Sequence, residues 1–223
     1  MGYNIAIDGP AGAGKSTIAK KVAKEKGFIY VDTGAMYRAM ALYFLKLGID
    51  PGDSNSIAKA CTGAEVKIVY EDGIQQVYLN EENVTDRLRE EMVGNMASKS
   101  SAVAEVREHL LALQRELART EDVVMDGRDI GTTVFPDAEL KIFVTATPEI
   151  RAQRRYDELK AKGQEASFDE ILENVKQRDY IDQNREVSPL RKADDALLLD
   201  NTDMTIPQQK EWLQEQFNKI VKR

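Results

Sequence analysis

Eight consecutive residues near the start of the chain have the spacing G-x-x-x-x-G-K-[ST]: Gly9-Pro10-Ala11-Gly12-Ala13-Gly14-Lys15-Ser16. Small residues let backbone N–H groups curl around phosphate oxygens, and a following helix adds the positive end of its dipole. In this pattern Lys15 reaches the β and γ phosphates, Ser16 offers its hydroxyl to Mg²⁺, and Thr17 caps the helix or contacts the α phosphate. The motif predicts a nucleoside triphosphate with Mg²⁺, and leaves a GTPase switch, an ATPase motor and a small-molecule kinase open.

A second group of charged residues follows the apolar run Val123-Val124-Met125. Asp126 ends this predicted strand, where a carboxylate holds Mg²⁺ or its waters in many triphosphate-binding proteins; an ordinary strand-end cap is the alternative. Arg128 and Asp129 come next, at the carboxyl edge of the predicted sheet, where open α/β folds bind ligands. We therefore expect Arg128 to point into the binding crevice.

Several arginines sit where they could neutralise phosphate groups, which is the main task of a phosphotransferase. Arg151, Arg154 and Arg155 recur at i, i+3 and i+4 of one predicted helix. Like charges at this spacing cost about 0.2 to 0.5 kcal/mol per pair unless an anion relieves them. We expect Arg154 to pair with Glu158, and a solvated basic face is the alternative reading of this helix.

Two more charged groups have both a functional and an ordinary interpretation. Alternating charges occupy i, i+4 and i+7 of the next predicted helix, at Arg178, Asp182 and Arg185. Taken alone, this pattern favours a surface ion-pair ladder. Asp32 and Thr33 follow the second predicted strand, with Arg38 one turn into a helix; the alternative is an N-cap followed by a surface arginine.

The elements that must position these groups alternate along the chain. Near-continuous apolar runs predict strands at 5–7, 28–31, 123–125, 140–144 and 196–199, and helical patterns cover 15–26, 34 onward until Gly48, 103–119, 148–162, and segments that start near 168 and 205. Strands of this kind are buried on both faces. Five of them alternating with helices predict an open, mostly parallel α/β sheet with right-handed crossovers.

One segment departs from this alternation. The predicted strands 66–70 and 76–79 flank Asp72-Gly73, a strong signal for a β-hairpin. A hairpin inserted between helices predicts a small lobe outside the main sheet. Because no Pro/Ser-rich linker separates it, we expect it to belong to the same folding unit.

Composition excludes several other classes. The 223 residues carry 31 Lys+Arg against 38 Asp+Glu, a net charge of −7 that argues against a nucleic-acid binder. Cys61 and His109 are the only cysteine and histidine, too few for a zinc site or a disulfide. The longest apolar run, 39–45, is too short for a transmembrane helix, and the N-terminus lacks the pattern of a signal peptide. Together these features predict a cytoplasmic protein that does not bind membranes.

Four blocks of residues together resemble bacterial-type cytidylate kinases. They are Gly9 to Thr17, Asp-Thr-Gly-Ala-Met-Tyr-Arg at 32–38, Asp-Gly-Arg-Asp-Ile-Gly at 126–131 followed by Val-Phe-Pro at 134–136, and Arg-Asp-x-x-Asp-x-x-Arg at 178–185. The likeness runs from about Asn4 to Lys222 and includes the hairpin. It implies a P-loop kinase fold with a five-stranded parallel sheet, helices on both faces, a nucleoside-monophosphate lobe with an inserted β-hairpin, and a short lid.

The resemblance also implies domain bounds and an activity. A single kinase domain would span 1–223, with the core sheet at about 1–33, 120–147 and 193–223, the monophosphate lobe at about 34–100 and the lid at about 151–166. The protein would transfer the γ-phosphoryl group of ATP to CMP or dCMP, giving CDP or dCDP and ADP, as a step of pyrimidine metabolism. Mg²⁺ would accompany ATP, and the enzyme would act as a monomer.

The family pattern assigns roles to the matching residues. The ATP set is the cradle 9–17 with Arg151, Arg154 and Arg155 of the lid. The CMP set is Asp32, Thr33, Arg38, Ser98, Arg107, Arg128, Asp129, Arg178, Asp182 and Arg185. Within it, Arg38, Arg128 and Arg185 would hold the 5′-phosphate, Asp182 oriented by Arg178 would bind the ribose, and Ser98, Arg107 and Asp129 would read cytosine. Transition-state charge would be stabilised by Lys15, Arg128, Arg185, Arg154 and Arg155.

Two rival classes remain at this point. A kinase of the same fold could act on UMP, AMP or a non-nucleotide alcohol, although paired arginines favour a phosphorylated acceptor. A nucleotide-dependent switch would bind without turnover, but guanine-specific switches usually carry Asn-Lys-x-Asp, and Asn201-Thr202-Asp203 lacks the lysine.

Overall fold

The core of the protein is an all-parallel sheet of five strands. The computed structural model describes residues 2–119 and 121–220, so residues 1, 120 and 221–223 of the predicted domain bounds lie outside it. The strands are β1 (Asn4–Asp8), β2 (Ile29–Asp32), β6 (Val123–Gly127), β7 (Leu140–Thr145) and β8 (Leu197–Asp200), in the spatial order β2-β6-β1-β7-β8. The predicted parallel sheet is therefore confirmed.

The predicted helices form within one or two residues of their expected bounds. They are α1 (Lys15–Lys26), α2 (Thr33–Lys46), α5 (Ala104–Leu117), α6 (Pro148–Ala161), α7 (Phe168–Asn184) and α8 (Ile206–Ile220). The sequence analysis named no helix at α3 (Ser54–Ala60) or α4 (Glu91–Ser100). Thr205 and Gln208 form a capping box before α8, because the Thr205 N–H donates to Gln208 Oε1 at 2.8 Å and the Thr205 hydroxyl accepts from the Gln208 N–H at 3.4 Å.

Helices cover both faces of the sheet because successive strand residues point to opposite sides. Ile5 and Ile7 of β1 pack with Ile18 of α1 and Leu213 of α8, whereas Ala6 packs in a separate cluster on the opposite face. That cluster also includes Val31 and Met125, with Leu111 and Leu117 of α5 against it. This arrangement confirms the predicted layers.

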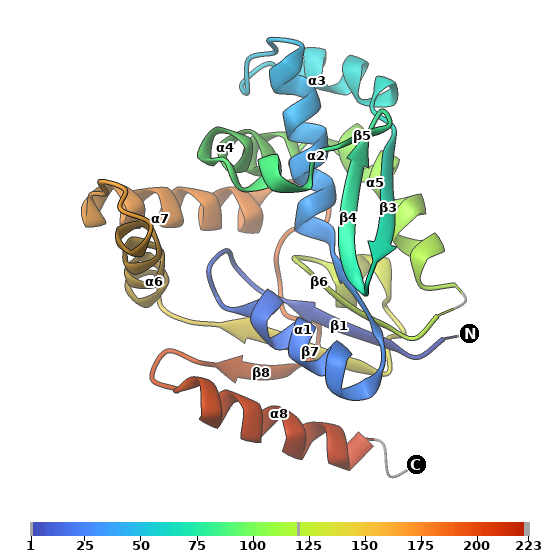
Figure 1. Cartoon of the computed structure of the whole chain (residues 1–223), viewed down its shortest axis with the longest axis vertical. Coiled ribbons are helices and arrows are strands. Elements are labelled where there is room, and N and C mark those ends of the chain that lie inside the picture. The colour runs from blue at the N-terminus through green and yellow to red at the C-terminus, as the bar shows by residue number, and fades with distance from the viewer. Residues whose placement is uncertain (1, 120, 221–223) are drawn as a thin grey trace.

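The hairpin forms a second, smaller sheet beside α2 (Figure 1). Its strands are β3 (Val66–Glu71), β4 (Ile74–Leu79) and β5 (Glu82–Asn83), of which β5 was not predicted. Asp72 and Gly73 both have positive φ (50° and 75°), as a two-residue hairpin turn requires. Met36, Met40 and Phe44 of α2 are fully buried in a core shared with this sheet, α3, α4 and α5.

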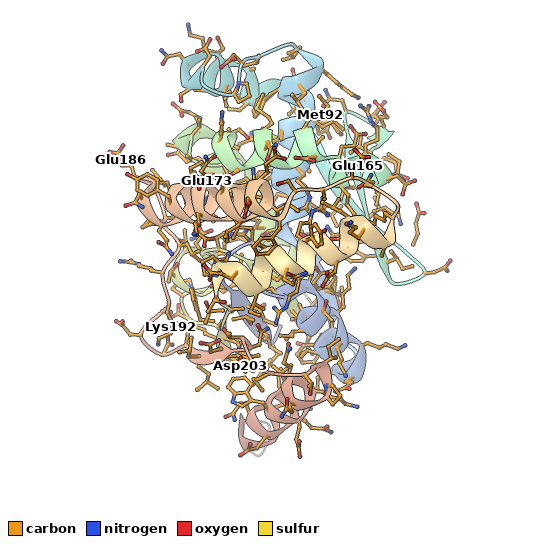
Figure 2. All side chains as sticks on the ribbon, turned by 90° about the vertical axis from the view of Figure 1, so that its left-hand side faces the viewer. Met92, Glu165, Glu173, Glu186, Lys192 and Asp203 are labelled. Carbon is orange, nitrogen blue, oxygen red and sulfur yellow. The ribbon has the colours of Figure 1, made fainter. Side chains whose placement is uncertain are left out.

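On the opposite side of α2, α4, α7 and α6 lie in successive tiers (Figure 2). Glu173 marks α7, and Glu165 lies in the loop between α6 and α7. The tiers are joined directly, since Asn174 Nδ2 of α7 donates to Asn95 Oδ1 of α4 at 3.3 Å. In the part of the chain that the structure describes, no helix is long and apolar enough to cross a bilayer.

Candidate active site

The glycine-rich loop connects β1 to α1 in the strand-loop-helix arrangement that the motif requires. Gly9 has φ 145°, and a Cβ there would lie 1.9 Å from the carbonyl oxygen of Val144. Gly14 ends the loop in the left-handed conformation, with no side chain capping the first turn of α1. The first N–H groups of α1 therefore remain available for an anion.

Lys15 lies buried within this loop, and its Nζ donates to the carbonyl oxygen of Pro10 at 2.7 Å. Burial, together with the positive charge of nearby Arg128, lowers the pKa of Lys15 to about 7. The predicted donor-side lysine and the predicted acceptor-side arginine are therefore close enough to repel each other. Such a pair is relieved by a multiply charged anion between them.

Ser16 and Asp126 meet at the mouth of the loop. The Ser16 hydroxyl donates to Asp126 Oδ2 at 2.8 Å, and the Tyr30 hydroxyl donates to Asp126 Oδ1 at 3.1 Å. Burial, together with the negative charge of Asp32, raises the pKa of Asp126 to about 6. The two side chains that the sequence analysis assigned to magnesium therefore lie side by side.

These oxygens fit a magnesium ion that is held mainly by phosphates and water. Hydroxyl and carboxylate oxygens are ligands that Mg²⁺ prefers, and it usually takes only one or two carboxylates from a protein. Among the described residues, no group of three or more His, Cys, Asp or Glu side chains could hold a metal ion on its own. The donor set matches an ion that arrives with a triphosphate.

Asp8, at the end of β1, joins the loop to the segment that follows β6. Its two carboxylate oxygens accept from the backbone N–H groups of Ile130 and Gly131 at 2.8 and 2.7 Å. Ile130–Val134 forms a short π-helical turn, and Asp129 directly precedes it. Asp8 therefore fixes the backbone beside Asp129, a role that the sequence analysis missed.

The three residues predicted to read a base form one buried group. Arg107 of α5 pairs with Asp129 at 2.5 Å and donates to the carbonyl oxygen of Ser101 at 3.3 Å, and the Ser101 hydroxyl donates to the carbonyl oxygen of Ser98 at 3.1 Å. Arg107 also stacks over the ring of Tyr37. Arg107 Nε and Ser98 Oγ are buried, and neither has a hydrogen-bond partner among the described residues. Both atoms are thus free to bind a polar ligand.

Arg178 is the arginine most clearly lacking a partner. Within residues 2–119 and 121–220 its side chain makes no hydrogen bond or ion pair, and it is only partly exposed. Burial, together with the charges of Arg128, Arg38 and Arg155, lowers its pKa to about 10. Such a group of guanidinium groups suits an anion.

Asp182 and Arg185 correct two expectations. They are 5% and 7% exposed, so the surface ion-pair ladder is wrong. Asp182 accepts from Arg128 Nε at 2.8 Å and lies 3.6 Å from Arg185 Nη1, so Arg128 and Arg185 orient it, whereas Arg178 acts on it only through charge. Arg185 lies just beyond α7, which lets its guanidinium reach Asp129 at 3.4 Å and the carbonyl oxygen of Ser188 at 2.7 Å.

The arginines of α6 have separate partners. Arg151 is 3% exposed, pairs with Asp179, and donates to the carbonyl oxygen of Ala11, which contradicts a solvated face there. Arg154 does not pair with Glu158 as predicted; it donates to Asn201 Oδ1 at 3.1 Å. Glu158 pairs with Arg155 at 3.0 Å instead. Arg154 thus reaches the residue after β8, and Glu158 pairs with Arg155 and Lys162 on its own helix end.

The block after β2 combines a helix cap with an arginine. Asp32 is the N-cap of α2, where Oδ1 accepts from Ala35 N–H at 2.9 Å, and Oδ2 pairs with Arg38 Nη2 at 3.0 Å. Thr33 is buried and donates its hydroxyl to the carbonyl oxygen of Asp126 at 2.7 Å. Arg38 Nε is buried and has no hydrogen-bond partner in the described part of the chain. The N-cap interpretation is confirmed, and the role of Arg38 in binding an anion stays a prediction.

Sequence reasoning missed further residues at this site. Asn201, fully buried after β8, donates to the carbonyl oxygen of Ala13 at 2.8 Å and so links the phosphate loop to Arg154. Tyr30 and Asp8 stand at or near the carboxyl ends of β2 and β1, where position alone could have identified them. His109 lies elsewhere, with Nε2 2.8 Å from the carbonyl oxygen of Ala64, consistent with a packing residue.

A phosphate loop on a parallel sheet, facing an anion site of arginines, defines a P-loop kinase. A crystal structure of an uncharacterized protein from Eubacterium ventriosum ATCC 27560 has the same fold, with a TM-score of 0.51 at 13% identity over 99% of both chains.

The family follows from the sequence matches. The family model described as cytidylate kinase matches residues 5–219. A cytidylate kinase of Bacteroides thetaiotaomicron is 60% identical over 223 residues, which cover 98% of this chain and 97% of that protein. One of Caldicellulosiruptor bescii is 49% identical over 219 residues, with 98% and 97% covered. The chain belongs to the cytidylate kinase family, which confirms the resemblance predicted from its motifs.

Burial of Asp8 predicts a pH-dependent stability. Burial raises the pKa of this carboxyl to about 6 from its ordinary 3.8, so between these values the folded protein binds more protons than the unfolded chain. The contribution of Asp8 to the free energy of unfolding should therefore decrease by about 3 kcal/mol as pH rises from below 4 to above 6. Urea unfolding of the wild type and Asp8→Asn across this range should show a flatter pH dependence in the variant; parallel curves would contradict the assignment. Asn has one side-chain oxygen for the two N–H groups that Asp8 accepts from, so the variant should be less stable at every pH. The test therefore compares how the free energy of unfolding changes with pH and not its absolute value.

Proposed function

We propose that this protein transfers the γ-phosphoryl group of ATP to CMP or dCMP, giving CDP or dCDP and ADP. The observation that carries the proposal is the pairing of Asp8 with Gly127, because the phosphate loop and Arg128 then follow adjacent parallel strands at the same edge of the sheet. Membership of the cytidylate kinase family supports the choice of acceptor. Lobes at about 34–100 and 151–166 would close over acceptor and donor.

The arginine cluster suits an acceptor that already carries a phosphate. Arg38, Arg128 and Arg178 interact through like charge, and Arg178 lacks a partner in the described residues. A 5′-phosphate placed among them replaces repulsion with charge-assisted hydrogen bonds. Asp182, held by Arg128 and Arg185, is left to accept from a ribose hydroxyl.

The buried group around Asp129 suits cytosine. A carboxylate accepts from the exocyclic N4 amine, while Arg107 and Ser98 donate to N3 and O2. Arg107 Nε and Ser98 Oγ have no partner in the described residues and are therefore free to do so. Uracil presents an acceptor in place of the N4 donor, so it would leave Asp129 facing an oxygen.

The reaction needs positioning and charge neutralisation more than proton transfer. An acceptor phosphate oxygen is already anionic at pH 7, so it attacks the γ phosphate in line without a general base. Lys15, Arg128, Arg185, Arg154 and Arg155 would stabilise the charge of the loose transition state. Closure of the lid would exclude water and suppress hydrolysis of ATP.

Magnesium would bind beside Ser16 and Asp126 and would neutralise part of the negative charge of the triphosphate. The protein contributes the hydroxyl, the carboxylate, and the Tyr30 hydroxyl that orients this carboxylate. A monomeric state and a cytoplasmic location stay predictions from the sequence.

The acceptor is tested by product separation. With ATP and Mg²⁺, the wild type should phosphorylate CMP and dCMP with much higher kcat/KM than UMP, AMP or GMP. Preference for another monophosphate would overturn the cytosine pocket while keeping the kinase. Tight triphosphate binding without transfer to any acceptor would overturn the kinase.

Removal of the loop lysine tests the donor side. Lys15→Ala should lower kcat by about a hundredfold or more, since one group aimed at transition-state charge has effects of that size. Lys24→Ala, an exposed lysine of the same helix, is the matched control and should keep the wild-type rate. Turnover of Lys15→Ala close to that control would be incompatible with the proposed role.

Replacement of the base-reading carboxylate tests specificity. Asp129→Ala should reduce the ratio of kcat/KM for CMP to that for UMP by about tenfold or more, because an unpaired buried polar group costs about 1 to 3 kcal/mol. The KM for ATP should change much less. An unchanged CMP/UMP ratio would show that Asp129 does not read the base.

A further inference from the structure

The inserted hairpin reaches the open edge of the main sheet. Among the described residues β2 is the last strand on its side, so one row of its backbone groups has no strand partner there. Two side chains of the hairpin supply the missing hydrogen bonds. Gln75 Oε1 accepts from Asp32 N–H at 2.8 Å, Gln75 Nε2 donates to the carbonyl oxygen of Asp32 at 3.2 Å, and the Tyr70 hydroxyl donates to the carbonyl oxygen of Tyr30 at 3.2 Å.

Both side chains come from one position of the hairpin. Tyr70 of β3 and Gln75 of β4 are directly paired across the two strands, close to the Asp72-Gly73 turn. Side chains that oppose each other in this way point to the same face. The tip of the hairpin therefore lies against β2. Figure 1 shows β3 and β4 running beside α2.

Asp32 connects the hairpin to the predicted acceptor site, because it contacts both Gln75 and Arg38. Gln75 holds both backbone polar groups of Asp32, at the junction where β2 becomes α2. The carboxylate of Asp32 holds Arg38 at 3.0 Å, and its other oxygen caps α2. Arg38 Nε, which has no partner within the described residues, is the group left to meet a ligand.

We propose that Gln75 is a positioning residue for the acceptor phosphate. It fixes the backbone of Asp32 and thereby the direction in which Asp32 presents Arg38. The inference rests on the proposed function, because it takes the 5′-phosphate of CMP as the ligand of Arg38. It also gives the hairpin a role: it holds the β2–α2 junction in place.

Two variants remove the contact, and two neighbours serve as controls. Gln75→Ala deletes the amide, and Gln75→Met keeps its length without a donor or acceptor. Gln76, next to it and also half-buried, has a side chain whose one hydrogen bond within the described residues is to Asn83 in the hairpin, so Gln76→Ala is the matched control. Tyr70→Phe loosens the hairpin at Tyr30 without touching Asp32.

Both Gln75 variants should raise the KM for CMP about fivefold, the effect of one neutral hydrogen bond, and leave the KM for ATP unchanged. Gln76→Ala and Tyr70→Phe should stay within twofold of the wild type. Thermal unfolding checks that each variant is folded. An equal rise of the CMP KM in Tyr70→Phe would mean that docking of the whole hairpin matters, which overturns the specific route through Gln75.

A double-mutant cycle with Arg38→Ala decides the matter. If Gln75 acts through Arg38, then Gln75→Ala should have no further effect on the KM for CMP once Arg38 is absent. If the effects of the two substitutions on the KM for CMP are additive and the wild type phosphorylates CMP, the inference is overturned and the proposed function stands. A wild type that does not phosphorylate CMP would overturn the proposed function, and the inference with it.

Discussion

The site depends on a balance of buried charges at the carboxyl edge of the parallel sheet. Asp8, Asp126, Asp129 and Asp182 are all buried there, against Lys15, Arg107 and Arg185. A buried charge is tolerated only where a partner or a hydrogen bond compensates for lost water. Asp129 and Asp182 are paired with arginines, so their removal would leave a buried charge unpaired. Asp8 and Asp126 are held by N–H and hydroxyl donors, so their removal would leave those donors without an acceptor.

The same pairs join parts of the chain that are far apart in sequence. Arg107 and Asp129 link α5 to the segment after β6, and Arg128 and Asp182 link that segment to α7. Asp8 joins it to β1 through two backbone N–H groups. The segment after β6 is therefore fixed from three sides, which gives Arg128 and Asp129 defined positions before a ligand arrives.

The sheet and the phosphate loop could be predicted because their signals are local. Apolar runs mark the five strands, and glycines mark the turn that needs positive φ. The partners of the arginines could not be predicted, because they depend on which elements cross. Arg154 meets Asn201 rather than Glu158, and Asp182 meets Arg128 rather than standing on a surface. Gln75 carries no local signal, since only the docking of the hairpin brings it to Asp32.

The polar atoms that have no partner within the described part of the protein say more about the ligand than the paired charges do. The ion pair of Arg151 with Asp179 joins α6 to α7, and its two charges already neutralise each other. Arg178, Arg38 Nε, Arg107 Nε and Ser98 Oγ lack partners in the described chain, and all lie in segments around the same edge of the sheet. An unsatisfied buried donor costs stability, so a molecule that completed these groups would gain binding free energy from them. That molecule needs an anionic end for the arginines and a polar, planar end for the group around Asp129, and a nucleoside monophosphate has both.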